Sequence, residues 1–239
     1  MSWFELIGFG PNGRGGILLI ATLVTLLVTL ASLAIGAFFG SLVAAAKLSQ
    51  SRTARLIGTS YTTLFRGAPE LLIIYLVYFG GSHAMTAIGH LFNVEGFLGM
   101  PSFMAGALAV GLISGAYQSE VYRGAFNAIS KGEIDAARSI GMSRWLLFRR
   151  IIIPQVLRFS LPGLGNVWQL SLKDSTLVSV TGLAELMRTT QKSAGSTHQY
   201  FVFYVLCGCL YLVLTFLSDR VFGVAERRVA LSFRQSIKR

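Results

Sequence analysis

Two adjacent charged residues, Lys173 and Asp174, stand near the middle of an otherwise uncharged apolar stretch. Placing an ionised side chain at the centre of a bilayer costs about 2.5 to 3.5 kcal/mol on insertion scales, so such residues normally face a cavity or a partner. Adjacent helical positions point about 100° apart, so these two ions are badly placed to neutralise each other. Gln169 shares a helical face with Lys173, and Ser171 shares another with Asp174. These polar stripes indicate either a substrate contact or a lock between helices.

Two more charges flank a pair of helix breakers in the segment Arg66-Gly67-Ala68-Pro69-Glu70. Irregular backbone at membrane depth is tolerated only where protein or water covers it, so this segment is predicted to line a cavity. A guanidinium there suits a carboxylate, and Glu70 suits an ammonium or guanidinium group. Alternatively, Arg66 reaches the headgroups and Glu70 pairs with Lys173. The hypothetical substrate-binding set is therefore Arg66, Glu70, Gln169, Lys173 and Asp174.

Metal-ligating and catalytic sets are not expected in this sequence. Cys207 and Cys209 are two apart in an apolar segment and project to different faces, which favours packing. The three histidines are scattered over segments expected to lie in or beside loops. No Gly-x-x-x-x-Gly-Lys-Ser/Thr segment occurs, so this chain is not expected to bind nucleotide itself. We expect no catalytic residues, no metal and no cofactor.

The elements that must position these residues are membrane-spanning helices. Hydrophobic residues make up 53% of the 239 and charged ones 13%, with a mean hydropathy of +0.62. A span needs roughly 20 apolar residues, so about five spans would use most of the chain as one all-α domain, residues 1–239. Residues 17–46 are taken as an uncleaved first helix, because no cationic segment precedes them. The five predicted spans are 17–46, 61–82, 101–119, 161–183 and 199–218.

The basic residues are unevenly distributed about these spans. The segments after the first, third and fifth spans hold sixteen of the 21 Lys and Arg residues, including Lys238 and Arg239 at the end. By the positive-inside rule these segments face the cytoplasm, which places the N-terminus in the periplasm and the C-terminus inside. The basic excess is thereby explained by topology and lipid headgroups, and nucleic-acid binding is not expected.

Small residues recur at four-residue spacing in the third predicted span. Gly111, Gly115 and Ser119 form one row, and Ala105 and Ala109 form another. Such rows let helix backbones approach closely, so this span is predicted to pack against another helix.

A long cytoplasmic loop, about residues 123–158, carries the most specific pattern. Ser130 and Glu133 have the spacing of a capping box, which predicts a helix start, and Gly141 is predicted to end that helix. A second short helix is expected from Ser143 to just before Pro154. With Ala136 and Ala137 presenting little bulk, the product would be a helix–turn–helix suited to docking in a groove of another protein.

Several motifs resemble those of ABC importer permeases. The loop matches the frame of their EAA loop at Asp135-Ala136-Ala137, Gly141, Ile151 and Ile153-Pro154. Further segments resemble the polar amino acid subfamily, that of the histidine, arginine and opine permeases, with the Q-type subunit most alike: Arg66 to Pro69, Gly115-Ala116-Tyr117, Gly163 to Asn166, Leu172-Lys173 and Thr176-Leu177. Asp135 stands where Glu is usual, and Ala68 replaces a frequent Thr, which removes a hydroxyl.

The resemblance implies a Type I importer subunit of the bacterial inner membrane that passes polar, preferentially basic, amino acids or opines. It implies a second permease subunit, either different or identical, together with two ATPase subunits that bind ATP and Mg²⁺, and a periplasmic solute-binding protein. ATP-driven closure of the ATPase pair would move the permease spans as rigid bodies. The residues implied in coupling to the ATPase are Glu133, Asp135, Ala136, Ala137 and Gly141.

Two other classes of protein remain open. A membrane-embedded enzyme would need a convergent catalytic set, and only Glu70, Lys173 and Asp174 group at all. A channel or scaffold would explain the spans but leaves the capped cytoplasmic motif unexplained. Co-purification of an ATPase partner distinguishes an importer from both.

Overall fold

The computed structural model describes residue 8, residue 10 and residues 13–237, and every element in that part of the chain is helical. Lys238 and Arg239, two of the cations counted above, lie outside the described residues. The elements are α2 (Gly15–Leu48), α3 (Arg52–Gly67), α4 (Glu70–Leu91), α5 (Ser102–Asn127), α6 (Lys131–Ser139), α7 (Arg144–Leu147), the π-helix η1 (Phe148–Ile152), α8 (Ile153–Asp174), the 3₁₀ helix η2 (Ser175–Thr181), α9 (Leu186–Thr197) and α10 (Tyr200–Ile237).

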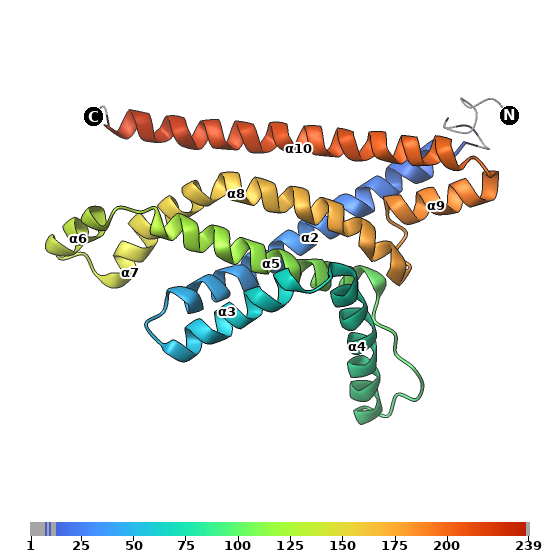
Figure 1. The fold of residues 1–239 in the computed structure, drawn as a ribbon, viewed down its shortest axis with the longest axis horizontal. Coiled ribbons are helices and arrows are strands. Elements are labelled where there is room, and N and C mark those ends of the chain that lie inside the picture. The colour runs from blue at the N-terminus through green and yellow to red at the C-terminus, as the bar shows by residue number, and fades with distance from the viewer. Residues whose placement is uncertain (1–7, 9, 11–12, 238–239) are drawn as a thin grey trace.

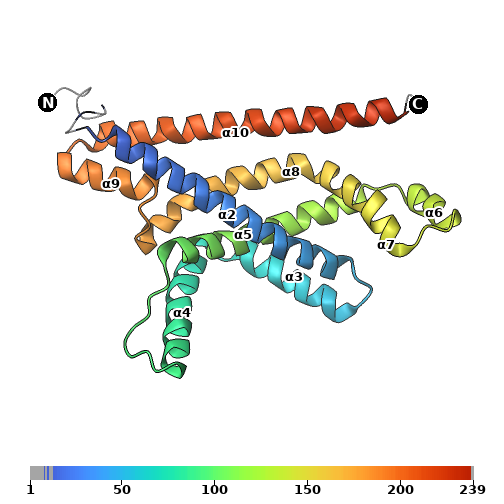
Figure 2. The ribbon, with the colours of Figure 1, turned by 180° about the vertical axis from the view of Figure 1, so that it is seen from behind.

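The helices form an elongated bundle with one diverging arm. Helices α2, α5 and α8 run alongside one another, and α10 lies along α8 (Figures 1 and 2). Helix α9 sits at one end of the bundle, and α6 and α7 form the opposite end. Helix α4 turns away from the bundle and is largely uncovered by the rest of the chain. The two ends of α5 are thereby distinct, since one lies beside α4 and η2 and the other leads into α6.

The core is a close contact between α2 and α5, as the small-residue rows predict. A Cβ at Gly40 would lie 2.9 Å from the carbonyl oxygen of Gly115, and one at Gly111 would lie 2.7 Å from the Ile35 side chain. Gln118 is fully buried at this seam and donates to the carbonyl oxygen of Leu33 at 3.1 Å. Glycine is required here because the two backbones nearly touch.

Several bounds of the five predicted spans differ from those of the observed helices. The predicted span over residues 61–82 is divided between α3 and α4, because the chain breaks between Gly67 and Glu70. Proline lacks an N–H donor and forces the residue before it into extended conformation, as Ala68 shows with φ −86° and ψ 149°. The prediction that Gly67 and Pro69 end regular helix is confirmed.

The remaining spans are displaced at their ends. Helix α5 continues to Asn127, and α10 continues well past residue 218. The fourth predicted span changes from α8 to the tighter η2 after Asp174 and stops at Gly182, which has φ +92°. By length and hydropathy three described helices can cross a membrane, namely α2, α4 and residues Tyr200–Val229 of α10.

The cysteines lie in α10, as expected for packing. Cys207 is buried in a cluster with Leu18, Leu186 and Phe203, whereas Cys209 is exposed, and both are free thiols.

Candidate functional site

The break between α3 and α4 places Arg66 and Glu70 on different helices. Arg66 ends α3 and lies over the ring of Tyr117 from α5, with 5.2 Å between the guanidinium carbon and the ring centroid. Glu70 is the first residue of α4, where a carboxylate is stabilised by the helix dipole. Because of the irregular backbone between them, the opposite charges of Arg66 and Glu70 have different neighbours.

Glu70 meets Asp174 at the end of α8. Asp174 is only 8% exposed, and the Glu70 carboxyl is close enough to act on it electrostatically. Lys173 is exposed but close enough to act on Asp174 electrostatically. The alternative in which Glu70 pairs with Lys173 is wrong, because no ion pair joins them among the described residues. Two adjacent carboxyl groups favour a cation between them.

Gln169, by contrast, is directed away from this pair. Its amide nitrogen donates to Asp219 Oδ1 at 2.8 Å, which ties α8 to α10. Of the five predicted substrate residues, the structure therefore brings together Glu70, Lys173 and Asp174, and leaves Arg66 and Gln169 with other neighbours.

The loop between α5 and α8 forms the helical hairpin that was predicted, with two differences. Gly141 ends α6 with φ +81°, and Met142 N–H donates to the carbonyl oxygen of Ala137 at 3.1 Å, as in a Schellman motif. The predicted capping box is wrong, because the Ser130 side chain makes no cap bond. Glu133 instead accepts a hydrogen bond from Gln155 Nε2 at 2.5 Å.

The second helix of the hairpin also differs from expectation. Ser143 caps α7 by accepting from Leu146 N at 3.3 Å, as predicted, but the helix does not end before Pro154. It widens into η1 and continues into α8, and Pro154 is tolerated because it lies in the first turn of that helix. The hairpin is therefore continuous with the helix that ends at Asp174.

The outer surface of the hairpin is partly apolar. Ala136 and Asp135 are exposed, and Ala137 is buried at 4%. The sequence reasoning missed Ile140, which is 78% exposed, and Trp145, which is 67% exposed. Their signal in the sequence was two large apolar residues on either side of a helix-ending glycine. Exposed apolar side chains of this size are typical of surfaces that contact another protein or a membrane.

One partly buried and one fully buried polar group were also missed. Lys47 ends α2, forms an ion pair with Glu120 of α5 and donates to Thr62 of α3 at 2.8 Å. Glu185 is fully buried and accepts from the backbone N–H groups of Met187 and Arg188 at 2.8 and 2.7 Å. It therefore caps α9. The contacts of these residues are long-range or depend on a local turn, so hydropathy gave no sign of them.

A family profile described as binding-protein-dependent transport system inner membrane component matches residues 36–231. The chain therefore belongs to this family of membrane permeases, which are transport components rather than enzymes. It is 50% identical over 237 residues to the octopine transport system permease protein of Rhizobium meliloti, covering 99% of this chain and 100% of the relative. It is 39% identical to the histidine/lysine/arginine/ornithine transport system permease protein of Escherichia coli, covering 94% and 98%.

A solved structure agrees with this assignment. A crystal structure of an amino acid ABC transporter with histidines superposes with a TM-score of 0.78 at 30% identity, covering 95% of this chain and 99% of the other. The all-helical Type I permease fold is thereby confirmed.

Proposed function

We propose that this chain is a five-span permease subunit through which polar solutes carrying a cationic group, such as basic amino acids or opines, enter the cytoplasm. The observation that carries the substrate class is the approach of Glu70 to the buried Asp174. Two carboxyl groups at the junction of α4 and α8 favour a guanidinium or ammonium group and disfavour an acidic solute. The relatives named above agree with this class.

The proposed topology follows the basic residues. The spans are α2, the broken pair α3 and α4, α5, α8 and α10, with the N-terminus in the periplasm and the hairpin end in the cytoplasm. The exposed hairpin then faces an ATPase subunit, and the α9 end faces a solute-binding protein. A second permease subunit would cover the free sides of α4, and two ATPase subunits would hold ATP and Mg²⁺.

Arg66, Gln169 and Lys173 have secondary roles in this proposal. Arg66 is free of acidic partners within the described residues, so it remains available to a substrate carboxylate. Lys173 is exposed beside Asp174 and sets the local charge. Gln169 holds α8 against α10 through Asp219 and would keep Asp174 in place.

The test is solute uptake by the assembled importer with Asp174→Asn or Glu70→Gln. Each change removes one charge at nearly constant volume, so the KM for a cationic amino acid should rise about tenfold or more. Glu95→Gln removes a charge from an exposed loop residue and is the matched control. If KM and ligand preference are unchanged in both variants, Glu70 and Asp174 do not bind the cationic group of the solute.

A further inference from the structure

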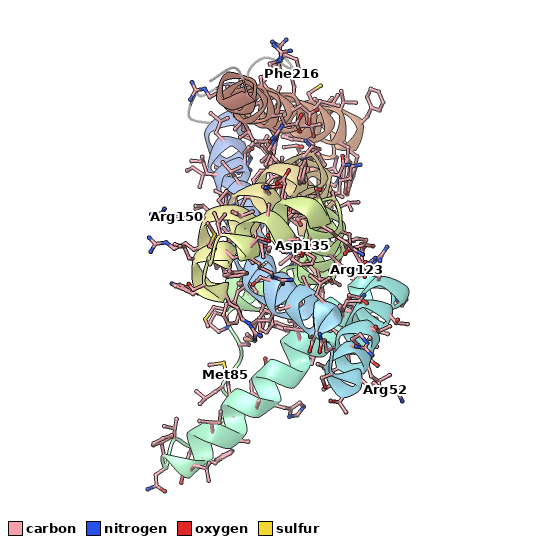
Figure 3. All side chains as sticks on the ribbon, turned by 90° about the vertical axis from the view of Figure 1, so that its left-hand side faces the viewer. Arg52, Met85, Arg123, Asp135, Arg150 and Phe216 are labelled. Atoms are coloured by element: carbon pink, nitrogen blue, oxygen red, sulfur yellow. The ribbon has the colours of Figure 1, made fainter. Side chains whose placement is uncertain are left out.

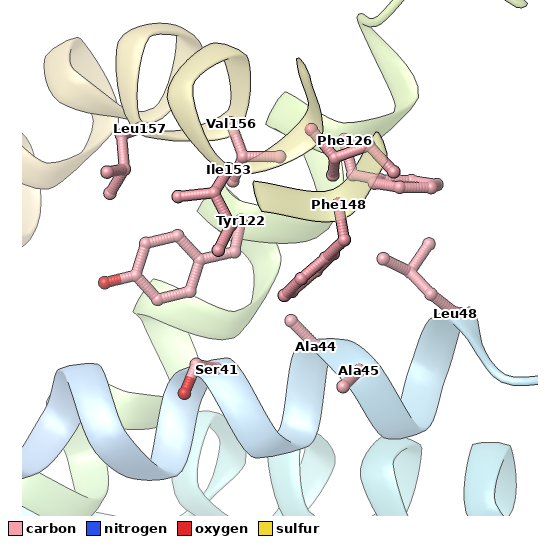
Figure 4. Close-up of a pocket in the computed structure, with 11 residues that line it drawn as sticks. Ser41, Ala44, Ala45, Leu48, Tyr122, Phe126, Phe148, Ile153, Val156 and Leu157 are labelled. Atoms are coloured by element: carbon pink, nitrogen blue, oxygen red, sulfur yellow. The ribbon is translucent and has the colours of Figure 1, made fainter. Parts of the chain in front are cut away.

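An apolar groove lies at the hairpin end of the bundle, far from the Glu70 and Asp174 pair along α8. It has a volume of about 450 Å³ and is bounded by α2 on one side and by α5, η1 and α8 on the others (Figure 4). Its lining residues are Ser41, Ala44, Ala45, Leu48, Tyr122, Phe126, Phe148, Ile152, Ile153, Val156 and Leu157.

The lining offers no unsatisfied polar group. The Ser41 hydroxyl donates to the carbonyl oxygen of Phe38 at 2.8 Å, and the Tyr122 hydroxyl donates to Gln118 Oε1 at 2.8 Å. A polar solute would gain no hydrogen bond here, and a groove without polar partners does not hold water well. The groove therefore favours an apolar occupant.

The helix turn that lines one end of the groove carries two arginines. Arg149 and Arg150 lie between the lining residues Phe148 and Ile152, and both are exposed. Figure 3 shows Arg150 projecting outward from the bundle. Within the described residues neither arginine forms an ion pair, whereas Lys47 and Arg123 nearby are already paired with Glu120. Two exposed guanidinium groups on the turn that lines an apolar recess suit an anionic head on a hydrocarbon chain.

We propose that this groove holds one acyl chain of an anionic phospholipid of the cytoplasmic leaflet, with its phosphate against Arg149 and Arg150. The proposal rests on the topology in the proposed function, which puts this end of the bundle at the cytoplasmic interface. Because η1 joins the hairpin to α8, a lipid seated there contacts the segment that links the ATPase surface to the solute site.

The test uses the assembled importer in mixed micelles with phosphatidylglycerol that carries a photoactivatable diazirine on one acyl chain. Adducts should map to residues 44–48 and 148–157. Unlabelled phosphatidylglycerol should compete better than phosphatidylcholine, by about fivefold for each arginine engaged. Arg149→Gln with Arg150→Gln should abolish that preference while leaving the adduct sites unchanged.

A second test fills the groove with a bulky side chain. Ala45→Trp should lower the adduct yield about fivefold or more by occupying the groove, whereas Val213→Trp on the exposed face of α10 should leave it unchanged. Three results would overturn the proposal. They are lipid adducts spread evenly over all exposed helices, lipid adducts on another subunit in place of this groove, and an unchanged yield in Ala45→Trp. Co-purification of an ATPase in the same samples shows that the importer is assembled. A failure of lipid binding is thereby distinguished from a failure of the proposed function.

Discussion

Glu133 of α6 accepts a hydrogen bond from Gln155 of α8 across 2.5 Å. Gln155 lies near the start of α8 and Asp174 ends it, so the helix spans about 29 Å between the hairpin and the Glu70 and Asp174 pair. A continuous helix fixed at one end to the hairpin can pass a movement of the hairpin to its other end. This connection gives a physical route by which an ATPase would act on the solute site.

Gln155→Ala should loosen that route without removing the docking surface. A hydrogen bond to a charged group contributes about 1.5 to 3 kcal/mol when buried, and this exposed one contributes less, so we expect about a threefold fall in solute moved per ATP hydrolysed. The measurement is the ratio of uptake to hydrolysis in proteoliposomes. Gln50→Ala, at an exposed position between α2 and α3, is the control. An equal ratio in wild type and Gln155→Ala would contradict the connection.

Ala136→Trp should prevent an ATPase subunit from docking. Ala136 is exposed on α6, and a bulky ring there would hold the two surfaces apart. We expect co-purified ATPase to fall about tenfold or more. Ala184→Trp places the same side chain at an exposed position near the other end of the bundle and should retain the ATPase. Retention of the ATPase by Ala136→Trp would exclude this face.

The fold itself can be tested at the seam between α2 and α5. Gly40→Ala puts a Cβ at 2.9 Å from a backbone oxygen of Gly115, which cannot move aside easily, and should cost about 1 to 3 kcal/mol of stability. Gly16→Ala, in the same helix but with nothing within 4 Å, should be neutral or slightly stabilising. Thermal unfolding of the two variants in one detergent measures the difference, and equal midpoints would contradict the close packing.

Glu185 should matter for stability although it lies outside the solute site. Glu185→Ala removes the cap of α9 and leaves the Met187 and Arg188 N–H groups without that acceptor, at a cost of about 1 to 3 kcal/mol. We expect a lower unfolding midpoint with KM unchanged in the folded fraction. Glu95→Ala in the exposed loop is the control. A changed KM with an unchanged midpoint would instead place Glu185 in the transport path.

The sequence predicted those features that depend on local rules. Proline and glycine end helices wherever they occur, so the break at Pro69 and the turn at Gly141 were readable, and small residues at four-residue spacing gave the α5 seam. The hydrogen bond from Gln155 to Glu133 could not be predicted, because Ser130 was a plausible local partner for Glu133. The approach of Glu70 to Asp174 joins residues 104 positions apart, and no periodicity in a single sequence encodes that distance.

The direction of α4 could not be predicted for the same reason. The hydropathy of residues 61–82 is continuous across the break, and only the tertiary structure shows that α4 leaves the bundle (Figure 1). Gln169 shares a helical face with Lys173 in the sequence, yet it bonds to Asp219 because α10 lies there.

The most direct measurement is uptake by the complete importer reconstituted with this chain, its partner subunits and its binding protein. Labelled arginine, octopine and glutamate are supplied in turn, with and without ATP inside the vesicles. We expect ATP-dependent uptake of arginine or octopine and no uptake of glutamate. Uptake that proceeds equally without ATP, or that favours glutamate, would contradict it.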